Sequence, residues 1–417
     1  MRLSDEGRVL AFRVDRLIDG NGGPPLRDAA LVVAGGRIAS VGSRTDVVVP
    51  EGAEVIEAPG HTLMPGLVDV HVHLAYSGIP HKRAFRAEGT DMSYPAMALR
   101  AAGYARDTLR AGFTAVRDLN APGGVVIDLR DAIDAGHVPG PRIRACGLGL
   151  SASGGHMDQP GFGDHVSLNG MNAVCDGPNA FRKGVREQVK RGADLIKINV
   201  CVSSVKDPER PYRQEMTDEE IEAACDEAHR LERPVAAHTS GGPAIATAVR
   251  AGLNTVEHGH WIDEETAALM AERGTFYVPT LLVNERNFDF TQEEMGASDA
   301  SWRWLNLSRE AKWESLVNAH RAGVKIAVGT DAGFMLPHGA MNAVEIELLV
   351  RGGLTPLEAI TAATRTGAEL LGLDEAGTLQ AGKLADLVLV CGDPSADITL
   401  LQDPSRLRVF KDGKEVS

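Results

Sequence analysis

Apolar runs and amphipathic segments alternate through the central part of the chain. Eight short, largely apolar runs predict strands, and the segments after them have helical periodicity. The predicted strands are 63–74, 113–118, 142–146, 194–200, 234–238, 253–258, 275–280 and 324–331. The predicted helices are 92–111, 128–135, 180–191, 218–231, 243–251, 263–273, 310–322 and 355–371. Eight regularly spaced units predict an α/β fold, a (β/α)8 TIM barrel, with a doubly wound sheet as the competing arrangement.

Short β-type runs between glycine-rich turns fill both ends of the chain. The pair Gly35-Gly36 separates two such runs, and Asp412-Gly413 separates two more, which is typical of hairpins. Neither end is large enough to form a stable sheet comfortably alone. We therefore expect a small β-sandwich domain built from residues 1–62 and 373–417, and a barrel domain of residues 63–372.

Composition narrows the functional classes. The 417 residues are 43% apolar, and 57 acidic residues against 43 basic ones give a net charge of -14. An acidic surface disfavours nucleic acid and anionic membranes as partners. No apolar run is long enough to span a bilayer, the first eight residues have no apolar signal core, and the five cysteines form no CxxC pair. We expect a cytoplasmic protein.

Residues that can bind metal ions stand at the ends of the predicted strands. His71 and His73 are two positions apart on the first strand, so both side chains leave the same face. Active sites of barrels lie where the strands end. Each residue alone has an ordinary structural explanation, but together they predict a metal site made of His71, His73, Lys197, His238, His258 and Asp331.

Lys197 is the most informative of these residues. It lies in Leu195-Ile196-Lys197-Ile198, and if the isoleucines face the helices, Lys197 points into the barrel. An unpaired ammonium is costly there, and it has no lone pair with which to bind a metal. A lysine that has captured carbon dioxide becomes a carbamate, with two oxygens that can bridge two cations. The alternative is a lysine neutralised by Asp331 or another carboxylate.

These motifs resemble those of the amidohydrolase superfamily. The chain is similar, over nearly its whole length, to the imidazolonepropionase-related branch that includes Xaa-Pro dipeptidases and ochratoxin-degrading amidohydrolases. The stretches that carry the resemblance, besides His71-Val72-His73, are Gly154-Gly155-His156-Met157-Asp158, Val256-Glu257-His258-Gly259, Tyr277-Val278-Pro279-Thr280, Gly329-Thr330-Asp331-Ala332-Gly333, Pro337-His338-Gly339 and the run from Gly377 to Asp386.

The resemblance implies two divalent metal ions, with zinc as the expected metal. His71, His73 and Asp331 would hold one ion, His238 and His258 the other, and a carbon dioxide-derived carbamate on Lys197 would bridge them. A hydroxide shared by the ions would attack an amide carbonyl, and Asp331 would carry the proton to the departing amine. We expect a small-molecule amide substrate and a homo-oligomer.

Three further residues are predicted to contact substrate. His156 resembles a family histidine that faces substrate, and His338 follows Asp331 near the mouth of the site. Ser240 stands where the prolidase-like relatives are expected to carry a tyrosine, which predicts room for a bulkier group. N-acyl amino acids are therefore expected to be better substrates than Xaa-Pro dipeptides. Tyr277 is predicted to be a core residue, and 288–304 a lid or an oligomer contact.

Other functions compete with this hypothesis. An Xaa-Pro-type dipeptidase and a cyclic-amide or carbamate hydrolase would use the same metal centre. A mononuclear deaminase on the same barrel would leave a bridging Lys197 idle. A non-catalytic scaffold would be expected to have lost ligands, yet all six ligand positions are present.

Overall fold

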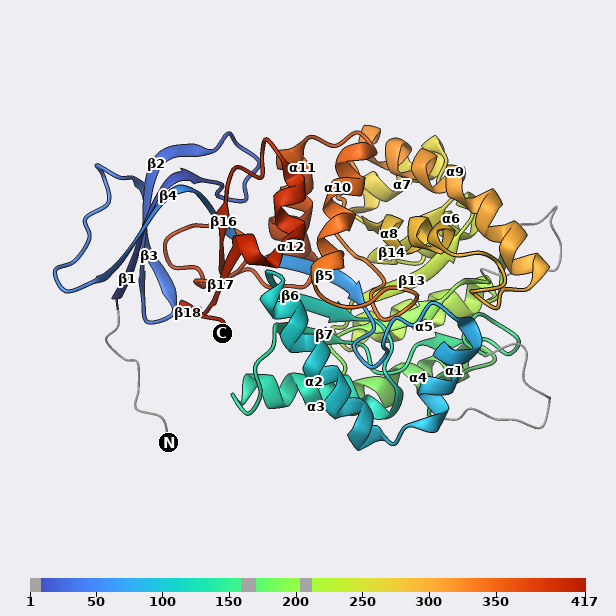
Figure 1. Ribbon diagram of the computed structural model, residues 1–417. Coiled ribbons are helices and arrows are strands. Elements are labelled where there is room, and N and C mark those ends of the chain that lie inside the picture. The colour runs from blue at the N-terminus through green and yellow to red at the C-terminus, as the bar shows by residue number, and fades with distance from the viewer. Residues whose placement is uncertain (1–8, 159–169, 203–211) are drawn as a thin grey trace. The chain divides into compact units, whose positions relative to one another are not determined.

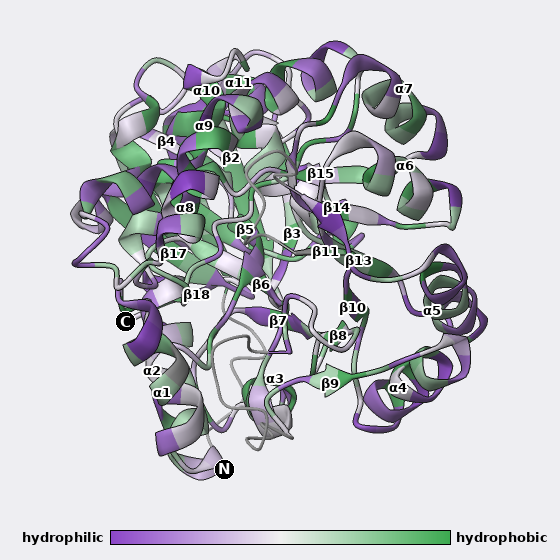
Figure 2. Ribbon diagram, turned by 90° about the vertical axis from the view of Figure 1, so that its right-hand side faces the viewer, coloured by the Kyte–Doolittle hydropathy of each residue, from purple (hydrophilic) through white to green (hydrophobic). Residues whose placement is uncertain are grey.

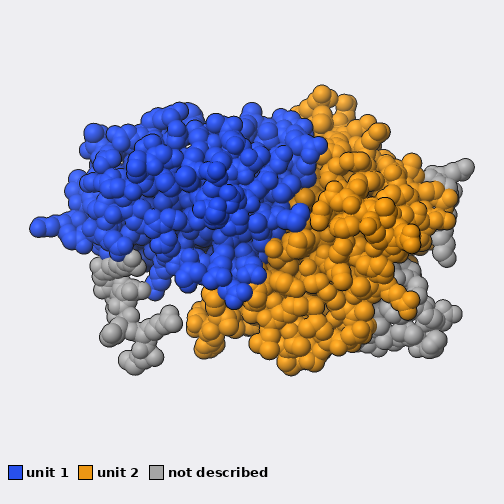
Figure 3. Space-filling view, viewed as in Figure 1, with its two compact units in different colours: residues 1–69, 105–116, 339–417 blue, residues 70–104, 117–338 orange. Residues whose placement is uncertain are grey.

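The computed structural model describes residues 9–158, 170–202 and 212–417, and they fall into two compact units. Unit 1 contains residues 1–69, 105–116 and 339–417, and unit 2 contains residues 70–104 and 117–338 (Figure 3). Unit 1 thus includes residues 339–372, which the sequence pattern assigns to the barrel. The predicted domain boundaries stay a prediction.

One seven-stranded sheet in unit 1 joins the two ends of the chain (Figure 1). Its order is β18-β17-β16-β4-β1-β2-β3, and β4 pairs parallel to β1 and antiparallel to β16. Phe12 and Phe410, from opposite ends of the sequence, pack edge to face with ring centroids 5.0 Å apart. A division into two packed sheets stays a prediction. The strands are β1 (Val9–Leu17), β2 (Leu26–Ala34), β3 (Arg37–Ser43), β4 (Glu54–Pro65), β16 (Leu387–Cys391), β17 (Leu407–Lys411) and β18 (Lys414–Glu415).

Unit 2 is built on parallel strands. A six-stranded sheet has the order β15-β14-β13-β10-β8-β9, and β5, β6 and β7 form a second sheet. Strands β10, β13 and β14 are buried along their whole length, as expected for parallel strands covered on both faces. The strands are β5 (Leu67–Val72) and β6 (Phe113–Asp118), which cross from unit 1, then β7 (Arg142–Ala145), β8 (Leu150–Ser151), β9 (Ala173–Val174), β10 (Ile196–Asn199), β11 (Cys201–Val202), β12 (Arg213–Gln214), β13 (Val235–Ser240), β14 (Thr255–His260) and β15 (Phe276–Val278).

Helices surround the parallel strands of unit 2. Figure 2 shows α4 to α7 outside β10, β13 and β14, with hydrophilic residues on their outer faces. Helix α5 begins with a reciprocal capping box between Thr217 and Glu220. The helices of unit 2 are α1 (Lys82–Asp91), α2 (Tyr94–Arg110), α3 (Val125–Asp134), α4 (Pro178–Lys190), α5 (Asp218–Arg230), α6 (Gly242–Arg250), α7 (Glu264–Arg273), α8 (Leu281–Arg286) and α9 (Asp299–Arg321), although part of α2 belongs to unit 1. Unit 1 also has α10 (Val344–Arg351), α11 (Pro356–Thr361) and α12 (Gly367–Leu370).

Three predicted elements need correction. Residues 324–331 form no regular strand; isolated bridges join Ile326 to Tyr277 and Ala332 to Val72. The helix predicted at 310–322 begins earlier, at Asp299, so it takes in the end of the 288–304 segment. The helix predicted at 355–371 is divided into α11, a π-helical turn and α12.

The fold class is α/β with parallel sheets, and closure into a complete barrel stays a prediction. Among the described residues, no helix combines the length and the apolar character needed to cross a membrane.

Candidate active site

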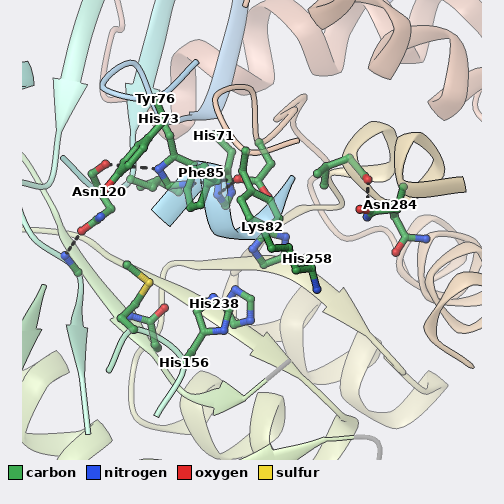
Figure 4. A pocket seen from close by; sticks show the side chains of 18 of the residues that line it. His71, His73, Tyr76, Lys82, Phe85, Asn120, His156, His238, His258 and Asn284 are labelled. Carbon is green, nitrogen blue, oxygen red and sulfur yellow. Dashed lines mark hydrogen bonds and ion pairs between the residues drawn. The ribbon is translucent and has the colours of Figure 1, made fainter. Parts of the chain in front are cut away.

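A cavity of about 250 Å³ lies within unit 2 at the ends of its strands. All six predicted metal ligands and His156 line this cavity, and Figure 4 shows the histidines around one space. Strands β10, β13 and β14 are neighbours in one sheet, and His71 of β5 reaches them, with its ring centroid 4.9 Å from that of His258. The seven residues are His71, His73, His156, Lys197, His238, His258 and Asp331.

His71, His73 and Asp331 form the tightest group. Their possible ligand atoms all lie within 4.8 Å of one another. Oδ1 of Asp331 is 3.0 Å from Nε2 of His73 and 3.4 Å from Nε2 of His71. Two ligands of one tetrahedral Zn²⁺, each about 2.0–2.2 Å from the ion, lie roughly 3.3 Å apart. The three residues therefore have the spacing of a metal site.

The hydrogen bonds of His71 determine which ring nitrogen can bind a metal. Its Nδ1 lies 2.8 Å from Oε2 of Glu257, and a carboxylate only accepts, so Nδ1 carries the proton. Burial lowers the pKa of His71 to about 4, so the ring is neutral and Nε2 carries a lone pair. That lone pair faces the Asp331 carboxylate. Two acceptors turned toward one point are best satisfied by a cation between them.

Glu257 is itself held by a buried guanidinium. Nη2 of Arg117 lies 2.5 Å from Oε1 of Glu257, and Nε of Arg117 donates to the carbonyl of Val70. Burial alone would raise the pKa of Glu257, but the charge of Arg117 and the hydrogen bond from His71 bring it well below its ordinary value. Glu257 therefore stays ionised beside His71.

His238, His258 and Lys197 form the second half of the constellation. The rings of His238 and His258 have centroids 4.5 Å apart. Nζ of Lys197 and Nε2 of His238 are buried and have no hydrogen-bond partner among the residues that the structure describes. Burial lowers the pKa of Lys197 to about 8 and those of His238 and His258 below their ordinary value. Buried polar atoms left without partners fit a site that is completed by a bound group.

Asp331 is ionised in this setting. Burial would raise its pKa, but its interactions with His71 and His73, including the hydrogen bond with His73, lower it below the ordinary value. The backbone is left-handed at Asp331 (φ 65°) and at His258 (φ 66°). Such conformations are uncommon away from glycine and are costly, by about 1–3 kcal/mol, and they concentrate at functional sites.

The three predicted substrate contacts have different positions. The ring of His156 stacks on that of His238 with centroids 3.8 Å apart, and it lines the cavity. Ser240 is fully buried, with Oγ 3.3 Å from Nδ1 of His260, and it is not among the cavity-lining residues. His338 also lies outside that lining; its Nε2 is 2.9 Å from the carbonyl of Tyr76.

The loop that follows Ser240 packs against an aromatic ring. A Cβ added to Gly241 would lie 2.2 Å from the ring of Tyr212. Room for a bulky substrate group beside Ser240 stays a prediction. Tyr277 is a core residue as predicted: it is fully buried, and its hydroxyl donates to the carbonyl of His258.

The walls of the cavity contain residues that the sequence reading missed. Phe85, Trp304 and Phe334 are among its apolar residues, and Asn284 and Ser301 among its polar ones. The last part of the 288–304 segment lies in α9 and contributes to this wall; its role as a lid or an oligomer contact stays a prediction. Glu257, whose carboxylate contacts Nδ1 of His71, was also missed, because strict alternation would place it on the opposite face from its neighbour His258.

Comparison with known proteins agrees with this site. Residues 62–416 match the model described as "Amidohydrolase family". The chain is 32% identical to ochratoxinase of Aspergillus niger, over 99% of this chain and 87% of the relative. It is 28% identical to imidazolonepropionase of Ralstonia nicotianae, over 91% and 90% of the two chains. The solved structure of a Xaa-Pro dipeptidase with bound methionine is similar, with TM-score 0.86, 31% identity and coverage of 98% and 99%.

Proposed function

The chain belongs to the amidohydrolase family and is a hydrolase that acts on carbon–nitrogen bonds, and we propose that it cleaves amide bonds of small molecules with the help of two divalent metal ions. The observation that carries the proposal is the grouping of His71, His73 and Asp331 within 4.8 Å. The partnerless buried nitrogens of Lys197 and His238 support a second metal position beside it.

The proposed metal positions follow the two halves of the site. His71, His73 and Asp331 would hold one ion, and His238 and His258 would hold the other, with Lys197 as a ligand shared between them. Nitrogen and carboxylate oxygen are suitable ligands for zinc, which is the metal we propose. When bound, the pair of ions supplies Lewis-acid polarisation of the amide carbonyl and lowers the pKa of water.

Lys197 would become a metal ligand by reaction with carbon dioxide. The neutral amine Nζ attacks the carbon of carbon dioxide, and an N–C bond forms. One C=O π pair moves to oxygen, and a proton leaves Nζ for solvent, which gives a carbamate with one negative charge. The lowered pKa of Lys197, caused by burial, increases the share of neutral amine at neutral pH. The carbamate replaces a buried ammonium, which cannot bind a metal, by two oxygen ligands.

Asp331 moves the proton during cleavage. Its carboxylate is ionised, so it can accept a proton from the attacking water. As the C–N bond breaks, the same group returns the proton to the leaving nitrogen, which departs as a neutral amine. His156 is kept neutral because burial lowers its pKa to about 4, and its ring N–H can donate to the substrate carbonyl.

The proposed substrates are N-acyl amino acids and related small amides. The cavity of about 250 Å³ is lined by both apolar and hydrogen-bonding side chains, which suits a small amphipathic amide. The similarity to ochratoxinase and the amidohydrolase family match support a small-molecule amide. A Xaa-Pro dipeptidase activity is the second candidate, favoured by the solved dipeptidase with TM-score 0.86. Comparing kcat/KM for an aromatic N-acyl amino acid and a Xaa-Pro dipeptide decides between them.

The substitution Asp331→Asn tests the proton-transfer role. We expect kcat to fall by roughly 10²–10⁴-fold, the usual contribution of a general acid–base group. The measurement is steady-state hydrolysis of one amide, with circular dichroism to verify the fold. Asp226→Asn, at an exposed position on α5, is the control and should keep the wild-type kcat. A near-normal kcat in Asp331→Asn would place the proton transfer at another group.

A further inference from the structure

Outside the proposed metal ligands, the charged side chains that line the cavity are all positive. Three lysines line it, Lys82, Lys197 and Lys312, and Asp331 is the one carboxylate among the described lining residues. This contrasts with the whole chain, whose net charge is -14. A concave site lined by one sign of charge concentrates ligands of the opposite sign. The lining therefore favours a substrate that carries a negative charge.

Two of the three lysines already have other roles. Lys197 lies among the proposed metal ligands. Lys312 is 1% exposed, and its ammonium donates to the carbonyl oxygen of Thr280 at 2.7 Å and to its Oγ1 at 3.1 Å. Lys312 thus supports the residue that contacts Nδ1 of His258. Lys82 is therefore the remaining candidate for binding substrate.

Lys82 is held at the cavity wall by two contacts with the segment around the start of α9. It is the first residue of α1, after the N-cap His81, and its backbone N–H donates to the carbonyl of Met295 at 3.0 Å. Its ammonium donates to Oγ of Ser301, which also lines the cavity. Ordering the long side chain in advance reduces the entropy cost of binding a ligand.

The ammonium of Lys82 faces the same space as His156. Both residues line the cavity. His156 in turn stacks on His238 at 3.8 Å. Figure 4 shows Lys82 among the labelled residues around the cavity, together with His156, His238 and His258. A substrate that reaches the histidines therefore lies within the field of Lys82.

An aromatic group stands next to Lys82 on α1. Phe85, three positions later, lies on the same helix face. Its ring packs against Tyr76 with centroids 4.7 Å apart and against Phe334 with centroids 5.0 Å apart. All three rings line the cavity. The wall thus offers a cation and an apolar aromatic surface side by side.

We propose that Lys82, positioned by Ser301, binds the free carboxylate of the substrate, while Phe85, Tyr76 and Phe334 contact the apolar group next to it. The inference rests on the proposed function and narrows its substrate class to amphipathic carboxylic acids. An ammonium has three donors, so it can serve Ser301 and a carboxylate together. Lys82 is then a specificity-determining residue, separate from the groups that cleave the bond.

The test compares N-benzoyl-L-phenylalanine with its carboxamide, which has the same shape and no charge. Release of benzoate is measured for the wild type, Lys82→Met, Lys82→Arg and the control Lys183→Met, at an exposed position on α4. We expect Lys82→Met to raise KM for the acid about 10- to 100-fold, the usual range for a hydrogen bond to a charged group. KM for the carboxamide should stay within about twofold, and Lys82→Arg should recover part of the affinity for the acid.

A binding measurement separates this inference from the proposed function. Calorimetric titration of Asp331→Asn with the acid and with the carboxamide needs no turnover. Preferential binding of the acid, abolished by Lys82→Met, supports the subsite. It does so even if neither compound is hydrolysed, because the absence of hydrolysis would count only against the proposed function. Equal binding of both compounds, or an acid affinity unchanged in a folded Lys82→Met protein, overturns the subsite.

Discussion

Three of the candidate ligand histidines share one arrangement: Nδ1 contacts a protein acceptor, and Nε2 is left for the cavity. Nδ1 of His71 lies 2.8 Å from Glu257, that of His73 3.4 Å from the carbonyl of Asn120, and that of His258 2.8 Å from Oγ1 of Thr280. These partners fix the ring orientation and turn Nε2 toward the cavity. Such neighbours of ligands tune metal affinity as strongly as many ligands do.

Glu257→Gln tests whether the partner of Nδ1 supports metal binding, at the histidine whose partner is a charged carboxylate. The amide can no longer hold the Nδ1 proton of His71 by charge, and Arg117 loses its ionic partner. We expect metal affinity to fall by roughly 10–100-fold, which competition with a chelator measures. Glu187→Gln, at an exposed position on α4, is the control. Unchanged affinity in a folded Glu257→Gln protein would contradict a positioning role.

The sequence predicted the ligands more readily than their supports. His71, His73, His238 and His258 stand at or beside the ends of apolar strands, so their convergence followed from the barrel pattern. Glu257 directly precedes His258, and strict alternation would place these two side chains on opposite faces. The left-handed backbone at His258 and the register shift between β13 and β14 change that alternation, and neither has a signature in the residue types.

At the scale of elements, one buried carboxylate orders the segment that presents His156. Glu215, between β12 and α5, accepts hydrogen bonds from Oγ of Ser151 and from the backbone N–H of His156. A Cβ on Gly155 would lie 2.4 Å from Oε1 of Glu215, so the close approach requires glycine. Glu215 thus connects the end of β8 with the wall of the cavity.

Glu215 should make stability depend on pH. Burial raises its pKa to about 7 from an ordinary value of 4.5, so the folded chain binds this proton more tightly than the unfolded chain. The contribution of Glu215 to the free energy of unfolding is therefore complete below about pH 4.5. It is lost as the pH rises through about 7, by up to about 3 kcal/mol.

The measurement for Glu215 is the unfolding midpoint of the wild type and of Glu215→Gln at several values between pH 4.5 and 8. The difference between the two proteins should shift in favour of the variant as pH rises, because the amide does not titrate. Glu222→Gln, at an exposed position on α5, should follow the wild type. Parallel pH profiles for wild type and Glu215→Gln would show that Glu215 does not titrate in this range.

Element types were predictable where the apolar pattern was strong. The strand predicted at 113–118 is β6, with the same bounds. Helix α1 was missed because Lys82–Asp91 contains few apolar residues. The segment 324–331 is apolar like a strand, yet it contacts its neighbours through single bridges and through bonds such as Val70 N–H to the carbonyl of Val328. Pairing with neighbouring strands in the folded chain decides whether such a segment forms a regular strand, and local composition does not predict that pairing.

At the scale of the whole molecule, the cavity and the chain ends belong to different units. All the described residues that line the cavity belong to unit 2, whereas the first and last strands share the sheet of unit 1. The family predicted from the sequence is confirmed by the match over residues 62–416. The homo-oligomer, the cytoplasmic location and the absence of nucleic-acid and membrane partners stay predictions.

The central claim is a two-metal centre bridged by Lys197, and metal content tests it most directly. Elemental analysis would compare the wild type, Lys197→Ala and the control Lys183→Ala after loading with zinc and bicarbonate. We expect about two ions per chain in the wild type and the control. Lys197→Ala should hold at most one ion and lose turnover, and short carboxylic acids should restore part of both by replacing the carbamate. Two tightly bound ions and full turnover in Lys197→Ala would contradict the account.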